Sequence, residues 1–206
     1  MFEFAISMLA NQPVDETPDI SYFVGPTIVG TDSGETLTGT INQDVIHGFD
    51  GNDIIRGDEG NDIIYGGTDN DRIRGGDDDD ILYGNAGRDI LIGQRGNDEL
   101  YGGEDNDRLR GRSGDDILCG GNGIDRVWGD TGADIFQVNV GDGRDIIKDF
   151  GRGDDRIELL TGTDAVDLTT FGSHVKVEYE GDLMAVIQNV STAELEQNGA
   201  FIDLVP

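Results

Sequence analysis

Large apolar residues recur at every ninth position through the middle of the chain. From Leu37 to Phe136, twelve positions spaced nine residues apart all carry Leu, Ile, Val or Phe. Each is flanked by one residue on either side, and each triplet follows a stretch rich in glycine and aspartate. Such a triplet is typical of a short strand whose middle side chain points inward while its neighbours point outward. The pattern predicts twelve three-residue strands separated by turns.

The complete unit is nine residues long and reads roughly G-x-x-G-x-D-x-U-x, where U is the large apolar residue. The first position is glycine in all twelve units from Gly30 to Gly129, and no insertion breaks the register between residues 30 and 137. The sixth position is always acidic, and its residues are Glu35, Asp44, Asp53, Asp62, Asp71, Asp80, Asp89, Asp98, Asp107, Asp116, Asp125 and Asp134. One turn and one short strand cannot bury their own apolar side chain, so the units must stack into a solenoid.

The first six positions of each unit are expected to form the turn. Glycine at positions one and four is expected to supply conformations with φ > 0, which other residues adopt only at a cost. Where position four is not glycine, it is Ser33, Asn42, Asp69, Asp78 or Asp105. Aspartate and asparagine are the types that best tolerate a left-handed backbone, so they suit this position.

The composition argues against an ordinary hydrophobic core. Only 35% of the 206 residues are hydrophobic, 33 are glycine, and the formal net charge is −29 at pH 7. So little apolar surface would normally leave a chain disordered, because its burial does not offset the loss of conformational entropy. Acidic residues on a fixed period can instead act as an array of cation ligands. Nucleic acid and anionic membranes are poor partners for such a polyanion.

The repeat resembles the calcium-binding nonapeptide repeats of the RTX (repeats-in-toxin, haemolysin-type) proteins. The resemblance covers residues 30–137 fully, with weaker copies to about residue 159. It implies an all-β fold: a parallel β-roll, or β-solenoid, of about six coils with two strands each, closed by a β-rich C-terminal cap. It also implies that Ca²⁺ lies between turns stacked on the same side.

With two units per coil, turns on the same side lie eighteen residues apart. One edge would stack Glu35, Asp53, Asp71, Asp89, Asp107 and Asp125, and the other Asp44, Asp62, Asp80, Asp98, Asp116 and Asp134. Neighbouring pairs would enclose about ten ions, each held by six or more oxygens. Further candidate ligands are Asp50 and Asp77 at position three and the turn glycines Gly51, Gly60, Gly87, Gly96 and Gly114. The alternative is a metal-free β-helix whose aspartates only form turns. It is disfavoured because turn chemistry would accept Asn or Ser at position six, and neither occurs there.

The outward positions of the two sheets differ in chemistry. One face would expose an apolar and aromatic set that includes Ile63, Tyr65, Ile81, Tyr83 and Tyr101. Either a partner or second copy docks there, or the side chains simply form cross-strand ladders. The other face would expose arginines that include Arg56, Arg74 and Arg110. Local pairing with acidic neighbours is favoured there over binding of an anionic glycan.

Three regions follow from these patterns: a flank at 1–29, the repeat array at 30–137 and a cap at 138–206. The flank is expected to open with a short helix to about Leu9 and to continue as a linker. The cap is expected to contain a hairpin over residues 174–190 and a short helix opened by Ser191–Glu194. The tail at 200–206 resembles the uncleaved C-terminal signal of type I secretion. No Lys or Arg precedes Arg56, so the start lacks the charged segment of a cleaved secretory signal.

No catalytic motif accompanies the repeats. The sequence contains neither H-E-x-x-H nor G-x-S-x-G, and the single cysteine, Cys119, excludes an internal disulfide. We therefore expect a secreted, non-enzymatic calcium-binding protein that folds on binding about ten Ca²⁺ ions outside the cell and has a structural or adhesive role. Two alternatives remain: an accessory C-terminal module of a secreted enzyme (a protease, lipase or alginate epimerase), or an intracellular calcium buffer.

Overall fold

A computed structural model describes residues 26–138, 143–151, 154–159, 167–172, 174–179, 182–188 and 202–204. Within these ranges the chain forms strands and no helix. The strands are β1 (Thr27–Val29), β2 (Thr36–Thr38), β3 (Val45–Asp50), β4 (Ile54–Glu59), β5 (Ile63–Thr68), β6 (Arg72–Asp77), β7 (Ile81–Ala86), β8 (Ile90–Arg95), β9 (Glu99–Glu104), β10 (Arg108–Ser113), β11 (Ile117–Gly121), β12 (Arg126–Thr131), β13 (Ile135–Val138), β14 (Asp145–Ile147), β15 (Arg156–Leu159), β16 (Asp167–Phe171), β17 (His174–Tyr179), β18 (Asp182–Gln188) and β19 (Ile202–Leu204).

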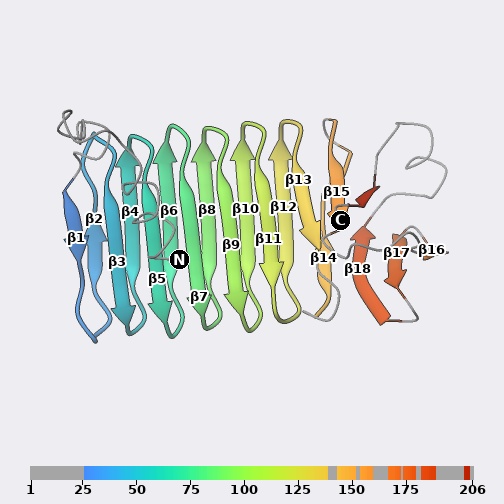
Figure 1. The fold of residues 1–206 in the computed structure, drawn as a ribbon, viewed down its shortest axis with the longest axis horizontal. Helices are drawn as coiled ribbons and strands as arrows, with labels where there is room; N and C mark the ends of the chain where they lie inside the picture. Colours follow the sequence, from blue (N-terminus) through green and yellow to red (C-terminus); the bar gives the residue numbers. More distant parts are fainter. Residues whose placement is uncertain are drawn as a thin grey trace, which may run out of the picture.

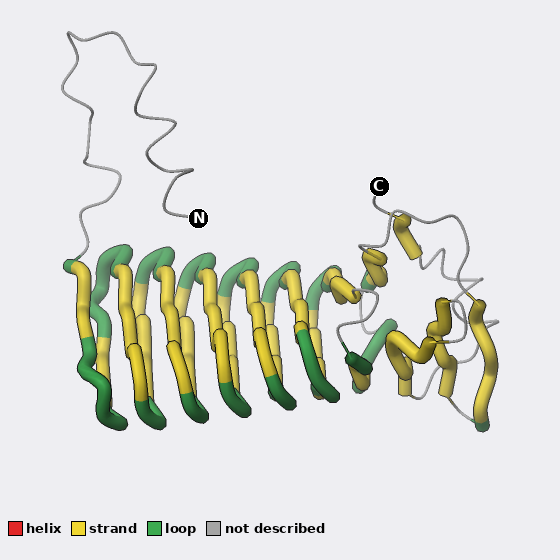
Figure 2. Tube along the Cα trace, turned by 60° about the horizontal axis from the view of Figure 1, so that its bottom comes forward, coloured by secondary structure: helices red, strands yellow, loops and turns green. Residues whose placement is uncertain are grey.

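The strands form two sheets, and from β1 to β16 consecutive strands lie alternately in one sheet and the other (Figures 1 and 2). One sheet has the order β1-β3-β5-β7-β9-β11-β13-β15-β19, and the other β16-β17-β18-β14-β12-β10-β8-β6-β4-β2. Within the array each strand pairs in parallel with the strand eighteen residues further on, as when Ile63 pairs with Ile81. The expected parallel β-solenoid with two strands per coil is therefore confirmed.

The strands are longer than the triplets predicted from the sequence. β5 and its regular neighbours have six residues, because the strand continues through positions one to three of the next unit. Gly67 and Thr68, for example, pair with Asn85 and Ala86 of the next coil. The turn therefore spans only positions four to six, and the predicted six-residue turn is wrong. A constant coil length allows this extension, since it keeps neighbouring backbones aligned beyond the apolar triplet.

Left-handed backbone occurs at positions two and four, not at positions one and four. All ten units from Gly48 to Gly129 have positive φ at both positions. At position four the expectation holds, and there Asp69, Asp78 and Asp105 share the conformation of the glycines. At position one the expectation is wrong, because those glycines have no positive φ.

The core of the solenoid is a single row of apolar side chains from each sheet. Every eighth-position residue from Ile46 to Phe136 is at most 2% exposed, and Leu37 packs against this core partly buried. The alternation of buried and less buried residues along β5 continues in every regular strand. The apolar period of nine residues is thus the sequence signature of this core.

Parallel coils extend past both limits of the predicted array. β1 precedes it, while β14 and β15 follow it and pair with β12 and β13. The predicted hairpin is confirmed as antiparallel β17 and β18, and β18 also pairs in parallel with β14. The two predicted short helices lie outside the described residues. No helix in the described part of the chain is long and apolar enough to cross a membrane.

Candidate metal sites

The position-six carboxylates form a hydrogen-bonded ladder along each edge of the solenoid. The backbone N–H of one such residue donates to Oδ1 of the residue eighteen positions further on, as from Asp62 to Asp80 at 2.8 Å and from Asp71 to Asp89 at 2.8 Å. The two ladders contain the two sets of residues that the eighteen-residue spacing predicts. Each carboxylate therefore fixes one neighbouring coil through one of its two oxygens.

The second oxygen of these carboxylates is buried and accepts no hydrogen bond. This holds for Oδ2 of Asp53, Asp62, Asp71, Asp80, Asp89, Asp98, Asp107, Asp116 and Asp125. All nine side chains are at most 1% exposed. A buried charged oxygen without a donor is strongly unfavourable, so its surroundings must supply a proton or a cation.

The position-one glycines provide space beside these oxygens. A Cβ built on Gly66 would lie 2.8 Å from the carbonyl oxygen of Gly84 and closer still to Oδ2 of Asp71. A carboxylate oxygen and a carbonyl oxygen thus face the same point from successive coils. Both groups are hydrogen-bond acceptors and hard oxygen ligands, which is the chemistry that Ca²⁺ prefers. The invariant glycine is therefore required for its missing side chain and not for its φ angle.

The first turn of each edge differs from the others. Thr40 N–H donates to Oδ2 of Asp44 at 2.5 Å, and Thr31 N–H donates to Oε2 of Glu35 at 2.9 Å. These donors satisfy the oxygen that is left without a partner in later coils. Oδ1 of Asp44 has no partner, since the residue at the matching place in the preceding coil is Pro26, which has no N–H.

The comparisons with known proteins agree with this geometry. The family model described as the RTX calcium-binding nonapeptide repeat (4 copies) matches overlapping segments at 29–64, 56–91, 65–100, 83–118 and 92–127. Residues 29–127 of this chain belong to the RTX calcium-binding repeat family. This family binds calcium and is generally structural.

Two solved structures are similar to the chain. The extracellular lipase LipA from Serratia marcescens has 17% identity and a TM-score of 0.36, covering 88% of this chain and 40% of the lipase. The AlgE6R3 subunit of the Azotobacter vinelandii mannuronan C5-epimerase has 21% identity and a TM-score of 0.22, covering 95% of this chain and 86% of the subunit. The chain thus spans less than half of the lipase. A search of curated proteins found no match.

The residues of the RTX array fit calcium through one carboxylate oxygen and one backbone carbonyl oxygen in a cradle such as that at Gly66. No group of three or more His, Cys, Asp or Glu side chains in the described ranges is placed to hold one metal. In a regular coil the free Asp Oδ2 and the glycine carbonyl oxygen would be the ligands, as for Asp71 and Gly84. Bound Ca²⁺ would supply the positive charge that these buried oxygens lack.

Burial raises the pKa of the position-six carboxyl groups from Asp53 to Asp134 and is the largest cause at each of them. At Asp62, Asp80, Asp107 and Asp116 neighbouring carboxylates also raise the pKa, while the donated backbone N–H lowers it. The pKa reaches about 8 at Asp80, Asp107 and Asp116, about 7 at Asp62 and Asp71, and about 6 at Asp89, Asp98 and Asp134. Near neutral pH, protons therefore compensate part of the buried charge when no cation does.

The other predicted ligands lie at the rim of the turns. Asp50 Oδ1 accepts a hydrogen bond from the Thr68 hydroxyl at 2.8 Å, and Asp77 forms an ion pair with Arg95 at 2.9 Å. The glycines predicted as ligands, Gly51, Gly60, Gly87, Gly96 and Gly114, are all at position four and have positive φ. A Cβ there would meet the backbone of the preceding coil. A role in metal binding stays a prediction for all seven residues.

Two kinds of residue accept hydrogen bonds between the stacked turns but were not predicted to do so from the sequence. They are the residues at position five and Asp155, which lies beyond the array. Asn52 Oδ1 accepts the backbone N–H of Asn70 at 3.1 Å, and Asn97 accepts that of Asp115 at 2.8 Å. Position five is Asn or Asp in seven of the twelve units, which was the available signal. Beyond the array, Asp155 continues one ladder by accepting the N–H of Asp134 at 3.1 Å.

The two outer faces of the RTX solenoid differ as expected. His47, Tyr65, Tyr83 and Tyr101 stack in one row, with ring centroids 4.8, 5.0 and 5.1 Å apart, so the predicted cross-strand ladder is present.

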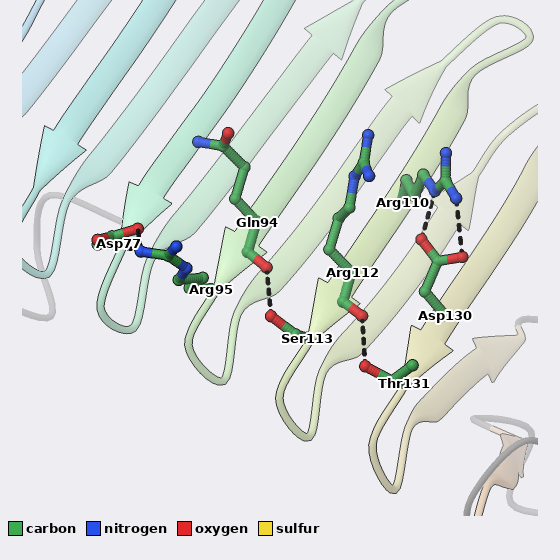
Figure 3. Close-up of a pocket in the computed structure, with 8 residues that line it drawn as sticks. All are labelled: Asp77, Gln94, Arg95, Arg110, Arg112, Ser113, Asp130 and Thr131. Carbon is green, nitrogen blue, oxygen red and sulfur yellow. Dashed lines mark hydrogen bonds and ion pairs between the residues drawn. The ribbon is translucent and has the colours of Figure 1, made fainter.

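On the other face, Arg110 donates to both carboxylate oxygens of Asp130, beside the groove that also contains Arg112 (Figure 3). The other arginines expected on this face form no ion pair with any described residue; they are Arg56, Arg72, Arg74, Arg108 and Arg126. The expected local pairing therefore holds for Arg110 alone.

Proposed function

We propose that this protein is a structural rod that folds outside the cell when it binds about ten Ca²⁺ ions. The observation that carries the proposal is the set of nine buried carboxylate oxygens without a donor, spaced regularly along both edges. Oδ2 of Asp134 faces Gly129 in the same way and gives a tenth position. Ten ions would add a charge of about +20 to the formal charge of −29.

Folding and calcium binding are then a single event. The core has one row of side chains per sheet, and the ladder carboxylates stack in every coil. Without cations these carboxylates repel one another or must take up protons. A site that exists only in the folded chain converts binding free energy into folding free energy.

An extracellular setting is supported by the RTX repeats themselves. Extracellular calcium-binding modules need only weak sites, with dissociation constants of about 0.1–1 mM, whereas a cytosolic buffer needs sites near 10⁻⁸ M. Such a chain would stay unfolded where calcium is scarce and fold where it is abundant. Export through a C-terminal signal agrees with this order of events.

We propose one docking surface on each outer face of the solenoid. The face that carries Tyr65, Tyr83 and Tyr101 would bind a second copy or a partner protein. The face that carries Arg56, Arg74 and Arg110 would bind an anionic glycan.

Circular dichroism during a calcium titration tests the proposal. We expect a change from a disordered to a β-rich spectrum that ends at about ten Ca²⁺ per chain, with midpoints near millimolar calcium. Magnesium should be a poor substitute, because it requires tight octahedral geometry. An endpoint of only one or two ions, or equal folding in magnesium, would contradict the proposed function. Saturation at submicromolar calcium would instead favour an intracellular buffer.

A further inference from the structure

The outer face of the second sheet carries positive charge and no negative charge within the array. Its outward residues, at positions seven and nine of six units, are Thr36, Thr38, Ile54, Arg56, Arg72, Arg74, Ile90, Ile92, Arg108, Arg110, Arg126 and Trp128. The matching positions of the first sheet carry no arginine or lysine and a single acidic residue, Glu99. In a chain with 43 acidic and 14 basic residues, composition alone would not give such a face. It is suited to an anionic ligand.

A groove lies along one border of this face, where the turns of one edge meet β8, β10 and β12. Its volume is about 570 Å³, and its lining includes Asn70, Arg88, Ile90, Asn106, Arg108 and Arg126. Arg108 and Arg126 occupy paired positions of β10 and β12, while Arg88 lies in the turn that leads into β8. Ile90 pairs with Arg108 from the other side and is half-buried. Three arginine side chains and an apolar one therefore line a single groove.

The three arginines of this groove have no anionic partner among the described residues. None of them takes part in an ion pair there. The acidic residue in the lining, Asp89, is only 1% exposed, and its Oδ1 accepts the N–H of Asp71. Arg108 and Arg126 lie on strands about 4.8 Å apart, and like charges opposite each other on neighbouring strands are unfavourable. A bound anion would remove this repulsion.

The neighbouring groove on the same sheet has the opposite arrangement (Figure 3). There Arg110 donates to both carboxylate oxygens of Asp130, and Arg95 pairs with Asp77 at 2.9 Å. The arginines of that groove thus find carboxylates within the chain, whereas Arg88, Arg108 and Arg126 do not. The groove with the three free arginines is therefore the better site for an external anion.

The available polar groups of this groove are all hydrogen-bond donors. Asn106 Oδ1 accepts the N–H of Ile124 at 2.9 Å, so the NH₂ group is the end of this side chain that is left for a ligand. Asn70 Oδ1 accepts the N–H of Arg88 at 3.1 Å and holds the turn. Groups that only donate select a ligand that only accepts. A carboxylate has two oxygens, whereas a sulfate or phosphate ester group has three, enough for one guanidinium each.

We propose that Arg88, Arg108 and Arg126 form a binding site for the sulfate or phosphate ester group of a glycan. This inference rests on the proposed function, because the groove exists only in the folded solenoid, and it names the group that the arginine face would recognise. Duplex DNA also carries tetrahedral oxyanions, but at one charge per about 1.7 Å of helix axis it would be repelled by a chain of net charge −29. A glycan with separated ester groups places one anion in the groove with less repulsion.

Nuclear magnetic resonance of the full chain in saturating calcium tests the site directly. The probe is glucose 6-sulfate, the carboxylate control is glucuronate, and inorganic sulfate represents the free ion. We expect glucose 6-sulfate to shift the backbone amide signals of Arg88, Ile90 and Arg108 to saturation, with a dissociation constant at least about threefold below that of glucuronate. Dextran sulfate should bind more tightly than a DNA duplex at equal total charge and physiological salt.

The test variants are Arg88→Gln and Arg108→Gln, and the matched control is Arg56→Gln. Arg56 is equally exposed on the same face and forms no ion pair with a described residue, but it lies outside the groove. Each test variant should raise the dissociation constant of glucose 6-sulfate at least about fivefold, and the control should leave it unchanged. Circular dichroism should show the same calcium requirement for folding in all three, since none of these residues belongs to a ladder.

An equal loss in Arg56→Gln, or equal affinity for glucuronate, would show diffuse charge attraction and overturn the site. Binding of inorganic sulfate without glucose 6-sulfate, or tighter binding of DNA than of dextran sulfate, would overturn the assignment to a glycan. In either case a wild-type chain that folds with calcium leaves the proposed calcium-dependent rod standing. A wild-type chain that does not fold with calcium would contradict the proposed function itself, and the groove with it.

Discussion

At the scale of single residues, the two oxygens of each array carboxylate do different work. Oδ1 of Asp80 accepts the backbone N–H of Asp62 at 2.8 Å, while Oδ2 is buried without a donor. An asparagine could keep the first contact through its carbonyl oxygen, but its NH₂ group could not bind a cation. Replacing aspartate by asparagine therefore separates the structural contact from the metal site.

Asp80→Asn is expected to remove one calcium ion and to weaken binding at the neighbouring sites. We expect the calcium concentration needed for folding to rise about tenfold, which corresponds to about 1.4 kcal/mol. Isothermal titration calorimetry measures both the stoichiometry and the affinity. Asp154→Asn is the matched control, since Asp154 is exposed and lies outside the repeat array. Equal effects of the two substitutions would contradict the assigned site.

The pH dependence follows from the raised pKa values. Burial raises the pKa of Asp80 to about 8 and that of Asp71 to about 7, whereas an unfolded aspartate titrates near pH 4. Without calcium the folded chain therefore binds more protons than the unfolded chain between these values. Acid should stabilise the calcium-free fold fully below about pH 4, and the stabilisation should disappear as the pH rises from about 6 to about 8.

With calcium present the same protons compete for the same oxygens. Calcium affinity should therefore fall as the pH is lowered from about 8 to about 5. Circular dichroism at several pH values, with and without calcium, measures both trends. Calcium-free order that increases with pH would contradict the assignment of these carboxyl groups.

At the scale of the strand, the proposed metal sites and the core packing are expected to contribute separately to stability. Leu100 is 0% exposed in β9, between Glu99 and Tyr101 on the outer face. The buried apolar side chains form one core cluster, and the ladder carboxylates lie at the turns. A change in the core should therefore reduce stability without removing a metal ligand.

Leu100→Ala is expected to lower the free energy of unfolding in saturating calcium by about 2–5 kcal/mol, the usual cost of such a cavity. Denaturant unfolding followed by circular dichroism measures this loss, and calorimetry should show an unchanged number of bound ions. Ile63→Ala, at a half-buried outer position of β5, should cost less. A loss of calcium ions in Leu100→Ala would show that core and metal sites cannot be separated.

The sequence predicted the strands better than it predicted the turns. The nine-residue apolar period gave the buried rows from Ile46 to Phe136, and the eighteen-residue spacing gave both ladders. It could not give the positive φ at position two, because Phe49 and Arg112 there are not types that favour such a backbone. Stacking of successive coils fixes that conformation.

At the scale of the whole molecule, the edges and the two faces of the solenoid carry different kinds of side chain. The edges carry the acidic ladders, one face carries stacked aromatic rings, and the other carries arginines, among which Arg110 pairs with Asp130 and Arg95 with Asp77. Twelve of the 43 acidic residues thus lie in the ladders, where cations would bind. Calcium would neutralise the edges and leave the faces available to partners.

The central claim is that cations at the turns, and not the thin core, hold the solenoid together. Small-angle X-ray scattering of the full chain at neutral pH, in calcium and then in excess chelator, tests it most directly. We predict a compact elongated particle in calcium and expansion in chelator toward a radius of gyration of about 50 Å, the value for an unfolded chain of 206 residues. A particle that keeps its calcium-bound dimensions after complete chelation would contradict the account.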